Sequence, residues 1–155
     1  MRPLIFSVVI LTAVLIHAET TDSLEVLGVA ETVFDAMLEG EGNVIAEHLS
    51  LSALGDMEEI LISLQEYPDP TFAMLNFNWG VEVIDMDVSE WNAGDLLSVI
   101  FSSPLSREVL YDPVPGEVFL EISGDSANVI RMINGEEWPM TLVREDELWK
   151  VNEIE

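Results

Sequence analysis

Apolar residues recur at helical spacing near the start of the chain. Between Leu24 and Leu38 they stand mostly three and four positions apart, which places them on one face of an α-helix. Ser23 suits the N-terminus of this helix, and Gly40 ends it. The pattern therefore predicts an amphipathic helix over 24–38.

A second helical pattern runs from Val44 to Leu64. It breaks near residues 48–52, where Ser50 or Ser52 can cap the second half. The pattern ends at Pro68, because proline is not tolerated in the interior of a helix. We expect two or three helices that pack on one another.

The middle of the chain mixes both patterns. Val81–Val88 alternates and predicts a strand. Ser89 then suits the start of a helix whose apolar stripe lies within 91–101 and which Pro104 stops. Residues 103–116 hold three prolines and are expected to form an irregular loop.

The last forty residues alternate in short runs that predict an antiparallel meander. The expected strands are 117–122, 126–133, 138–144 and 148–154. Asn134-Gly135 marks a tight hairpin, because both residues tolerate positive φ. One face of such a sheet must be covered, so the fold class is α+β, with N-terminal helices packed on a C-terminal antiparallel sheet.

The first residues have the layout of a secretory signal peptide. Arg2 precedes an apolar run, Leu4–Ile16, which ends near the small residue Ala18. We expect cleavage after Ala18, which divides the chain into a signal peptide, 1–18, and one domain, 19–155. An uncleaved anchor is the alternative. The prediction is export, to a periplasm or outside the cell, and no stable membrane insertion after cleavage.

The charge balance narrows the choice of partners. The chain has 30 acidic against 5 basic residues, a net charge of −25, and no cysteine. Such a surface repels phosphate backbones, so nucleic acid is not an expected partner. Without cysteine the protein has no disulfide and no thiolate metal site.

Two segments resemble the NTF2-like (cystatin-like) superfamily, in particular its small bacterial extracytoplasmic members. They are the opening helix, residues 29–40, and the C-terminal run from Gly124-Asp125 to Leu148-Trp149-Lys150-Val151. The resemblance implies a curved sheet wrapped around helices as a cone, often with a pocket at its open end, and a possible homodimer. Since enzymes and non-catalytic binding modules share this fold, it does not decide between them.

The catalytic candidates are His48, Asp35 and Asp56. His48 is the only histidine after residue 18, and a pocket isomerase or dehydratase needs a base within reach of its substrate. A histidine at a helix end also serves as a C-cap, and each aspartate lies among other acids, as on a solvated face. No nucleophile, base and orienting group form a motif, and no cofactor is expected.

For a metal, the candidate ligands are Asp85, Asp87 and Glu90, which could give oxygens to calcium. No EF-hand spacing is present. In a chain this acidic, such clusters also arise by chance.

The candidate ligand pocket consists of Trp91, Phe101 and Arg131. The two aromatics share the stripe expected to face the sheet. Arg131 lies in the middle of a strand that is apolar on both faces; turned inward it would need a carboxylate or an anionic ligand, and we favour an outward side chain paired with a glutamate. The sequence therefore suggests a non-enzymatic module for a small apolar ligand or a protein partner, with a pocket enzyme and an acidic cation-binding protein as alternatives.

Overall fold

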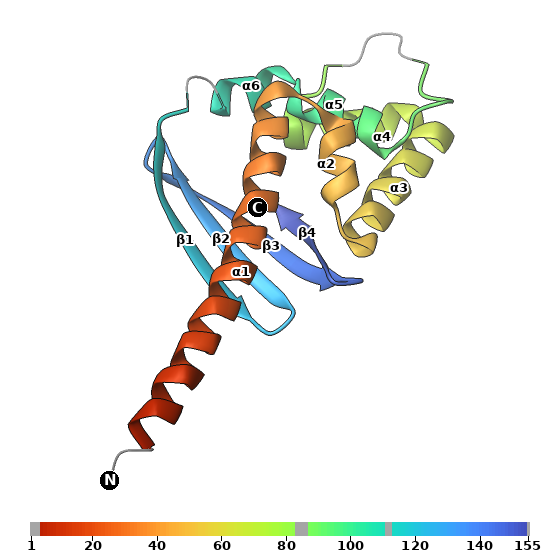
Figure 1. Cartoon of the computed structure of the whole chain (residues 1–155). Helices are drawn as coiled ribbons and strands as arrows, with labels where there is room; N and C mark the ends of the chain where they lie inside the picture. Colours follow the sequence, from red (N-terminus) through yellow and green to blue (C-terminus); the bar gives the residue numbers. More distant parts are fainter. Residues whose placement is uncertain (1–3, 83–86, 111–112, 155) are drawn as a thin grey trace.

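The computed structural model describes residues 4–82, 87–110 and 113–154, with side chains described from Thr21 onward except at residue 109. Six helices precede a four-stranded antiparallel sheet, so the chain is α+β, as predicted (Figure 1). The helices are α1 (Leu4–Glu39), α2 (Gly42–His48), α3 (Leu51–Glu66), α4 (Pro68–Trp79), α5 (Ala93–Phe101) and α6 (Pro104–Val109). The strands are β1 (Pro115–Ser123), β2 (Ser126–Ile133), β3 (Glu136–Glu145) and β4 (Leu148–Ile154).

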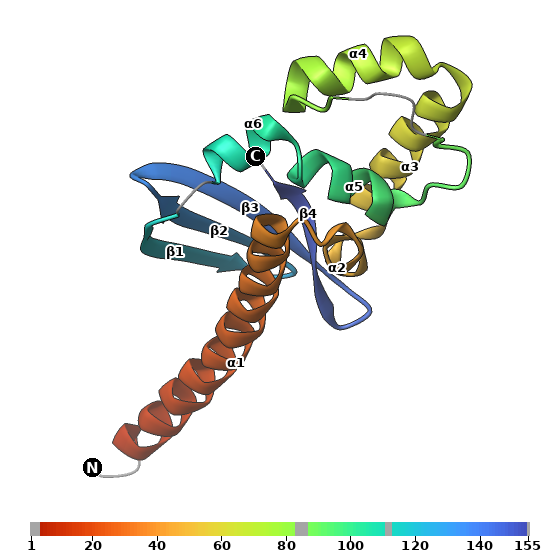
Figure 2. The same cartoon turned by 90° about the horizontal axis from the view of Figure 1, so that it is seen from above.

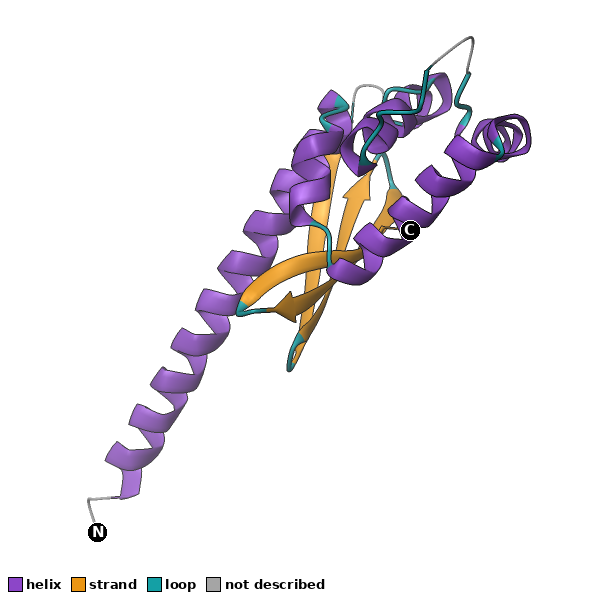
Figure 3. Cartoon of the chain, turned by 90° about the vertical axis from the view of Figure 1, so that its right-hand side faces the viewer, coloured by secondary structure: helices purple, strands orange, loops and turns teal. Residues whose placement is uncertain are grey.

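Helix α1 is longer than the sequence pattern indicates. It runs without a break from Leu4 to Glu39, so the expected start at Ser23 is wrong. Its C-terminus is where it was expected, since Gly40 takes a φ of +73°. Figures 1 and 3 show the N-terminal part of α1 projecting beyond the sheet. In the described part of the chain, no helix has both the length and the apolar character needed to cross a bilayer.

The turn between α2 and α3 is attached to the sheet. Ser50 is the N-cap of α3, because its side chain accepts a hydrogen bond from the Ala53 amide, which decides between the two serines proposed as caps. Leu49 forms an isolated parallel bridge with Val151 of β4. The break in the second helical pattern is thus confirmed, and it ties the helices to the edge of the sheet.

Proline placement explains two helices that the sequence pattern did not predict. Pro68 and Pro104 lie in the first turn of α4 and α6, where a missing N–H costs nothing and the fixed φ suits the helix. They begin helices rather than only ending the preceding ones, and residues 104–109 are therefore not irregular loop.

Helix α5 begins later than expected. Asn92, not Ser89, is its N-cap, and Asp95 completes a capping box by bonding back to the Asn92 amide. Half of the strand expected over Val81–Val88 falls on residues 83–86, which lie outside the described residues. The described residues on either side of them form no strand.

The sheet is an open meander with the strand order β1-β2-β3-β4. Each hairpin has a two-residue turn, and Asn134-Gly135 has positive φ at both positions, as a type I′ turn requires. Register shifts after Pro115 and after Thr141 insert an extra residue in each edge strand, and such bulges bend a strand. The predicted strands and turns are confirmed, and the sheet does not close into a barrel.

The core has two main parts. The larger one lies between α1, α2 and one face of the sheet, and fully buried residues such as Val33, Ile45 and Leu142 form it. A second cluster joins α3, α4 and α5 around Leu64, Leu75 and Leu96. Figure 2 shows α3 and α4 to one side of the sheet, with α1 across it. The space between α1 and the sheet is therefore where both layers present apolar side chains.

Candidate ligand pocket

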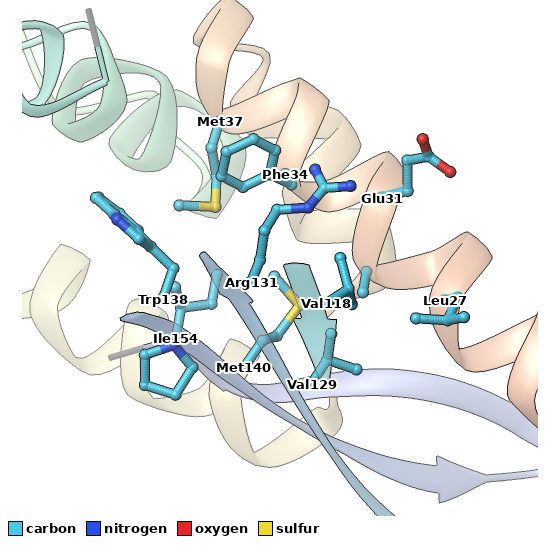
Figure 4. Close-up of a pocket in the computed structure, with 12 residues that line it drawn as sticks. Leu27, Glu31, Phe34, Met37, Val118, Val129, Arg131, Trp138, Met140 and Ile154 are labelled. Carbon is cyan, nitrogen blue, oxygen red and sulfur yellow. The ribbon is translucent and has the colours of Figure 1, made fainter. Parts of the chain in front are cut away.

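A pocket of about 220 Å³ lies between α1 and the sheet (Figure 4). One helix and all four strands line it, and ten of its twelve lining residues are apolar. The two charged residues among them are Glu31 and Arg131. This volume is somewhat below the range of about 300–1,000 Å³ that is usual for drug-sized ligands, so the pocket suits a small molecule.

The helical wall follows from the periodicity of α1. Leu27, Ala30, Phe34 and Met37 stand three and four positions apart and line the pocket. Residues at this spacing share one helix face. Leu27 is only partly buried, whereas Met37 is 1 % exposed, so the pocket is deepest toward the C-terminal end of α1.

The sheet wall follows from strand alternation. Val129 and Arg131 project from β2, and their neighbours Met140, Trp138 and Val118 come from β3 and β1. Arg131 stands directly between Val118 and Trp138 in the ladder. The arginine is thus surrounded by apolar side chains on its own face of the sheet.

Arg131 turns inward, so the expectation of an outward side chain is wrong. Its guanidinium carbon lies 4.6 Å from the centroid of the Phe34 ring. The face of the Phe34 ring, and not a carboxylate, therefore makes the favourable contact with this cation. In Figure 4 the guanidinium lies beside Phe34, and the Glu31 carboxylate points away from the sheet residues.

The two aromatic residues proposed for the pocket lie elsewhere. Trp91 precedes α5 and packs in the cluster of α3, α4 and α5. Phe101 packs against the buried cluster that contains Phe34, but it does not line the pocket itself. The structure therefore brings only Arg131 of the three to this pocket.

The catalytic candidates are not brought together. His48 Nδ1 donates to the Val44 carbonyl oxygen at 2.8 Å, which is a helix C-terminal contact within α2. Asp35 is exposed on α1. Asp56 is also exposed and lines a second hollow of about 220 Å³ between α3, α5 and β4. Neither His48 nor Asp35 lines the pocket between α1 and the sheet.

The proposed metal ligands are only partly described. Asp85 lies outside the described residues. Asp87 Oδ1 accepts a hydrogen bond from the Ser89 amide at 3.0 Å, and the Ser89 hydroxyl and amide together lower the pKa of Asp87. Within the described ranges, no three His, Asp or Glu side chains converge in a way that could hold a metal ion.

Of the twelve lining residues only Arg131 was proposed from the sequence, and the other eleven include Glu31, Phe34, Trp138 and Met140. Two patterns could have found them. The stripe of α1 that includes Phe34 is visible in its three- and four-residue spacing, and the alternation along 138–144 places Trp138 and Met140 on one face. What the sequence does not show is the packing of α1 on the sheet, which brings Phe34 beside Arg131.

The chain matches no protein-family model, no curated protein and no solved structure.

Proposed function

We propose that the protein is an exported, non-enzymatic binding module that holds a small apolar molecule between α1 and the inner face of its sheet. The observation that carries this proposal is the pocket itself, a space of about 220 Å³ with mostly apolar walls. Pockets that combine apolar walls with a few polar groups are typical of small-molecule sites.

The NTF2-like resemblance is part of the same proposal. Helices laid across one face of a bulged, open antiparallel sheet agree with a cone-like roll. Export rests on the signal-like residues 1–18. A pocket at the open end of the cone is what the resemblance implies.

The positions of the catalytic candidates favour binding over catalysis. A general base must lie within hydrogen-bond reach of its substrate, and none of His48, Asp35 and Asp56 lines this pocket. Saturable turnover of a carbonyl or hydroxyl compound that is lost in His48→Ala or Asp35→Asn would contradict the proposal.

The direct test is an NMR titration of the full chain with 1-octanol. We expect saturable shifts that centre on Trp138, Met140 and Val129. Val118→Trp should abolish them, because Val118 lines the pocket, is 42 % exposed and can be enlarged at the mouth without cutting into the core.

The matched control is Val114→Trp, which adds the same bulk at a residue 65 % exposed that does not line this pocket. It should bind like the unaltered protein. Binding that Val118→Trp leaves unchanged would place the ligand elsewhere and refute the proposal.

A further inference from the structure

We infer that the ligand of this pocket is an apolar molecule with a single negative charge, a carboxylate, and that Arg131 holds its charged group. This inference rests on the proposed function, because it assigns the ligand class of the same pocket. It is carried by the surroundings of the guanidinium.

Arg131 differs from the other fixed cations of the described chain. Arg107 and Lys150 donate to backbone carbonyl oxygens at 2.5 and 2.7 Å, and Arg144 forms an ion pair with Asp22. Among the described residues, no oxygen atom accepts a hydrogen bond from Arg131, and no carboxylate pairs with it. This charge is therefore free to bind a ligand.

The contact with Phe34 leaves the hydrogen-bonding groups of Arg131 available. The guanidinium carbon lies over the Phe34 ring, 4.6 Å from its centroid, so this contact is with the ring face and pairs the cation with no oxygen atom. The five N–H donors of a guanidinium lie at its edge, where two of them match the oxygens of one carboxylate. Phe34 thus positions the cation without neutralising its charge.

The charge of the whole chain limits the ligand to one negative charge. At a net charge of −25, the protein repels anions at long range. One guanidinium can neutralise one charge at contact, where its effect is strongest. Glu31 also lines the pocket, and its exposed carboxylate points away from the sheet residues (Figure 4), so it is not placed to select a cation.

The size of the pocket sets the size of the apolar part. A water molecule takes up about 30 Å³ in the liquid, and a methylene group is of similar size. A pocket of about 220 Å³ therefore accepts a tail of about seven carbons. Octanoate has a tail of that length beside its carboxylate.

The test compares three probes of equal chain length, octanoate, 1-octanol and octylamine, by calorimetric titration of the full chain at neutral pH. We expect octanoate to bind at least about tenfold more tightly than octanol, as charge-assisted hydrogen bonds allow. Octylamine should bind most weakly. Arg131→Met should make octanoate no better than octanol, and Arg131→Lys should leave a reduced preference.

Lys150→Met is the control, because it removes the same charge from a residue that does not line the pocket. It should keep the full preference for octanoate. Suppose that octanoate and octanol bind equally, that Arg131→Met changes neither and that Val118→Trp abolishes both. This result would overturn the inference of an anionic ligand, while the apolar pocket would remain the binding site. Tighter binding of octylamine would also overturn it. If no probe binds in a way that Val118→Trp abolishes, the proposed function itself fails.

Discussion

The Ser50 hydroxyl donates a hydrogen bond to Asn152 Oδ1 at 2.9 Å, between residues 102 positions apart. Asn152 is the extra residue of β4, because the register shift after Thr141 leaves it without a partner on β3. The same hydroxyl oxygen accepts from the Ala53 amide at 3.1 Å. One buried serine therefore joins the start of α3 to the bulge in the edge strand.

Replacing Ser50 with alanine should lower the free energy of unfolding by about 1–3 kcal/mol, since it removes a helix cap and leaves a partner unsatisfied. Urea unfolding followed by circular dichroism measures this loss. Ser52→Ala is the control, because Ser52 is exposed and should change stability by less than about 0.5 kcal/mol. Equal losses in the two variants would show that Ser50 has no special role.

The crossing of α2 and α5 depends on glycine. A Cβ atom on Gly42 would lie 2.0 Å from the carbonyl oxygen of Gly94 and 2.3 Å from the amide nitrogen of Ser98. Both are backbone atoms, which cannot move aside cheaply, so Gly42→Ala should cost at least about 2 kcal/mol. Thermal unfolding checks this value.

Gly55 offers the opposite outcome for the same substitution. It lies within α3, and a Cβ there would meet nothing within 4 Å. Gly55→Ala should therefore stabilise the protein by about 0.5–1 kcal/mol through helix propensity. If Gly55→Ala lowered the stability as Gly42→Ala does, the close approach at Gly42 would not be the cause of the loss.

The last hairpin contains a strained residue. Glu147 has a φ of +67°, a conformation that costs most L-residues about 1–2 kcal/mol and glycine almost nothing. Glu147→Gly should raise the free energy of unfolding by about 0.5–1 kcal/mol. Glu137→Gly, at an exposed position within β3, should lower it by a similar amount. In chemical unfolding, the free energies of unfolding of the two variants should therefore change in opposite directions.

The sheet was predictable because its signals are local. Alternation and turn residues such as Asn134-Gly135 mark each hairpin within a few positions, and the observed strands match the expected ones to within a few residues. The helices were less predictable from the sequence. Pro68 and Pro104 can end one helix or begin the next, and the sequence pattern does not show which.

The pocket was less predictable than the sheet. The strand that carries Arg131 is apolar on both faces, so alternation did not decide which way the arginine points. Its contact with Phe34 joins two residues nearly a hundred positions apart, and only the packing of α1 on the sheet creates it. For the same reason, Trp91 was expected at the sheet but packs among the helices.

The Ser89 side chain should control the ionisation of Asp87. Hydrogen bonds from the Ser89 hydroxyl and amide lower the pKa of Asp87, so Ser89→Ala should raise this pKa toward its ordinary value. Because the folded-state pKa is depressed, the stability that these bonds contribute is present above the unfolded pKa and is lost as the pH falls through the folded one. An NMR titration of the Asp87 carboxyl carbon measures the shift. Ser52→Ala should leave the midpoint of the Asp87 titration unchanged. An unchanged midpoint in Ser89→Ala would show that Ser89 does not control the ionisation of Asp87.

The net charge of −25 should make stability depend on ionic strength rather than on a particular cation. Between about 0.01 M and 1 M salt the Debye length falls from about 30 Å to about 3 Å, so the self-repulsion of the acidic surface weakens and the melting temperature should rise with potassium chloride. Calcium and magnesium at equal concentration should then act alike, because ions of equal charge screen equally. A selective site would distinguish the two ions by their size and ligand number.

A melting temperature several degrees higher in calcium than in magnesium, with the difference lost in Asp87→Asn and Glu90→Gln, would contradict this prediction and favour the cation-binding alternative.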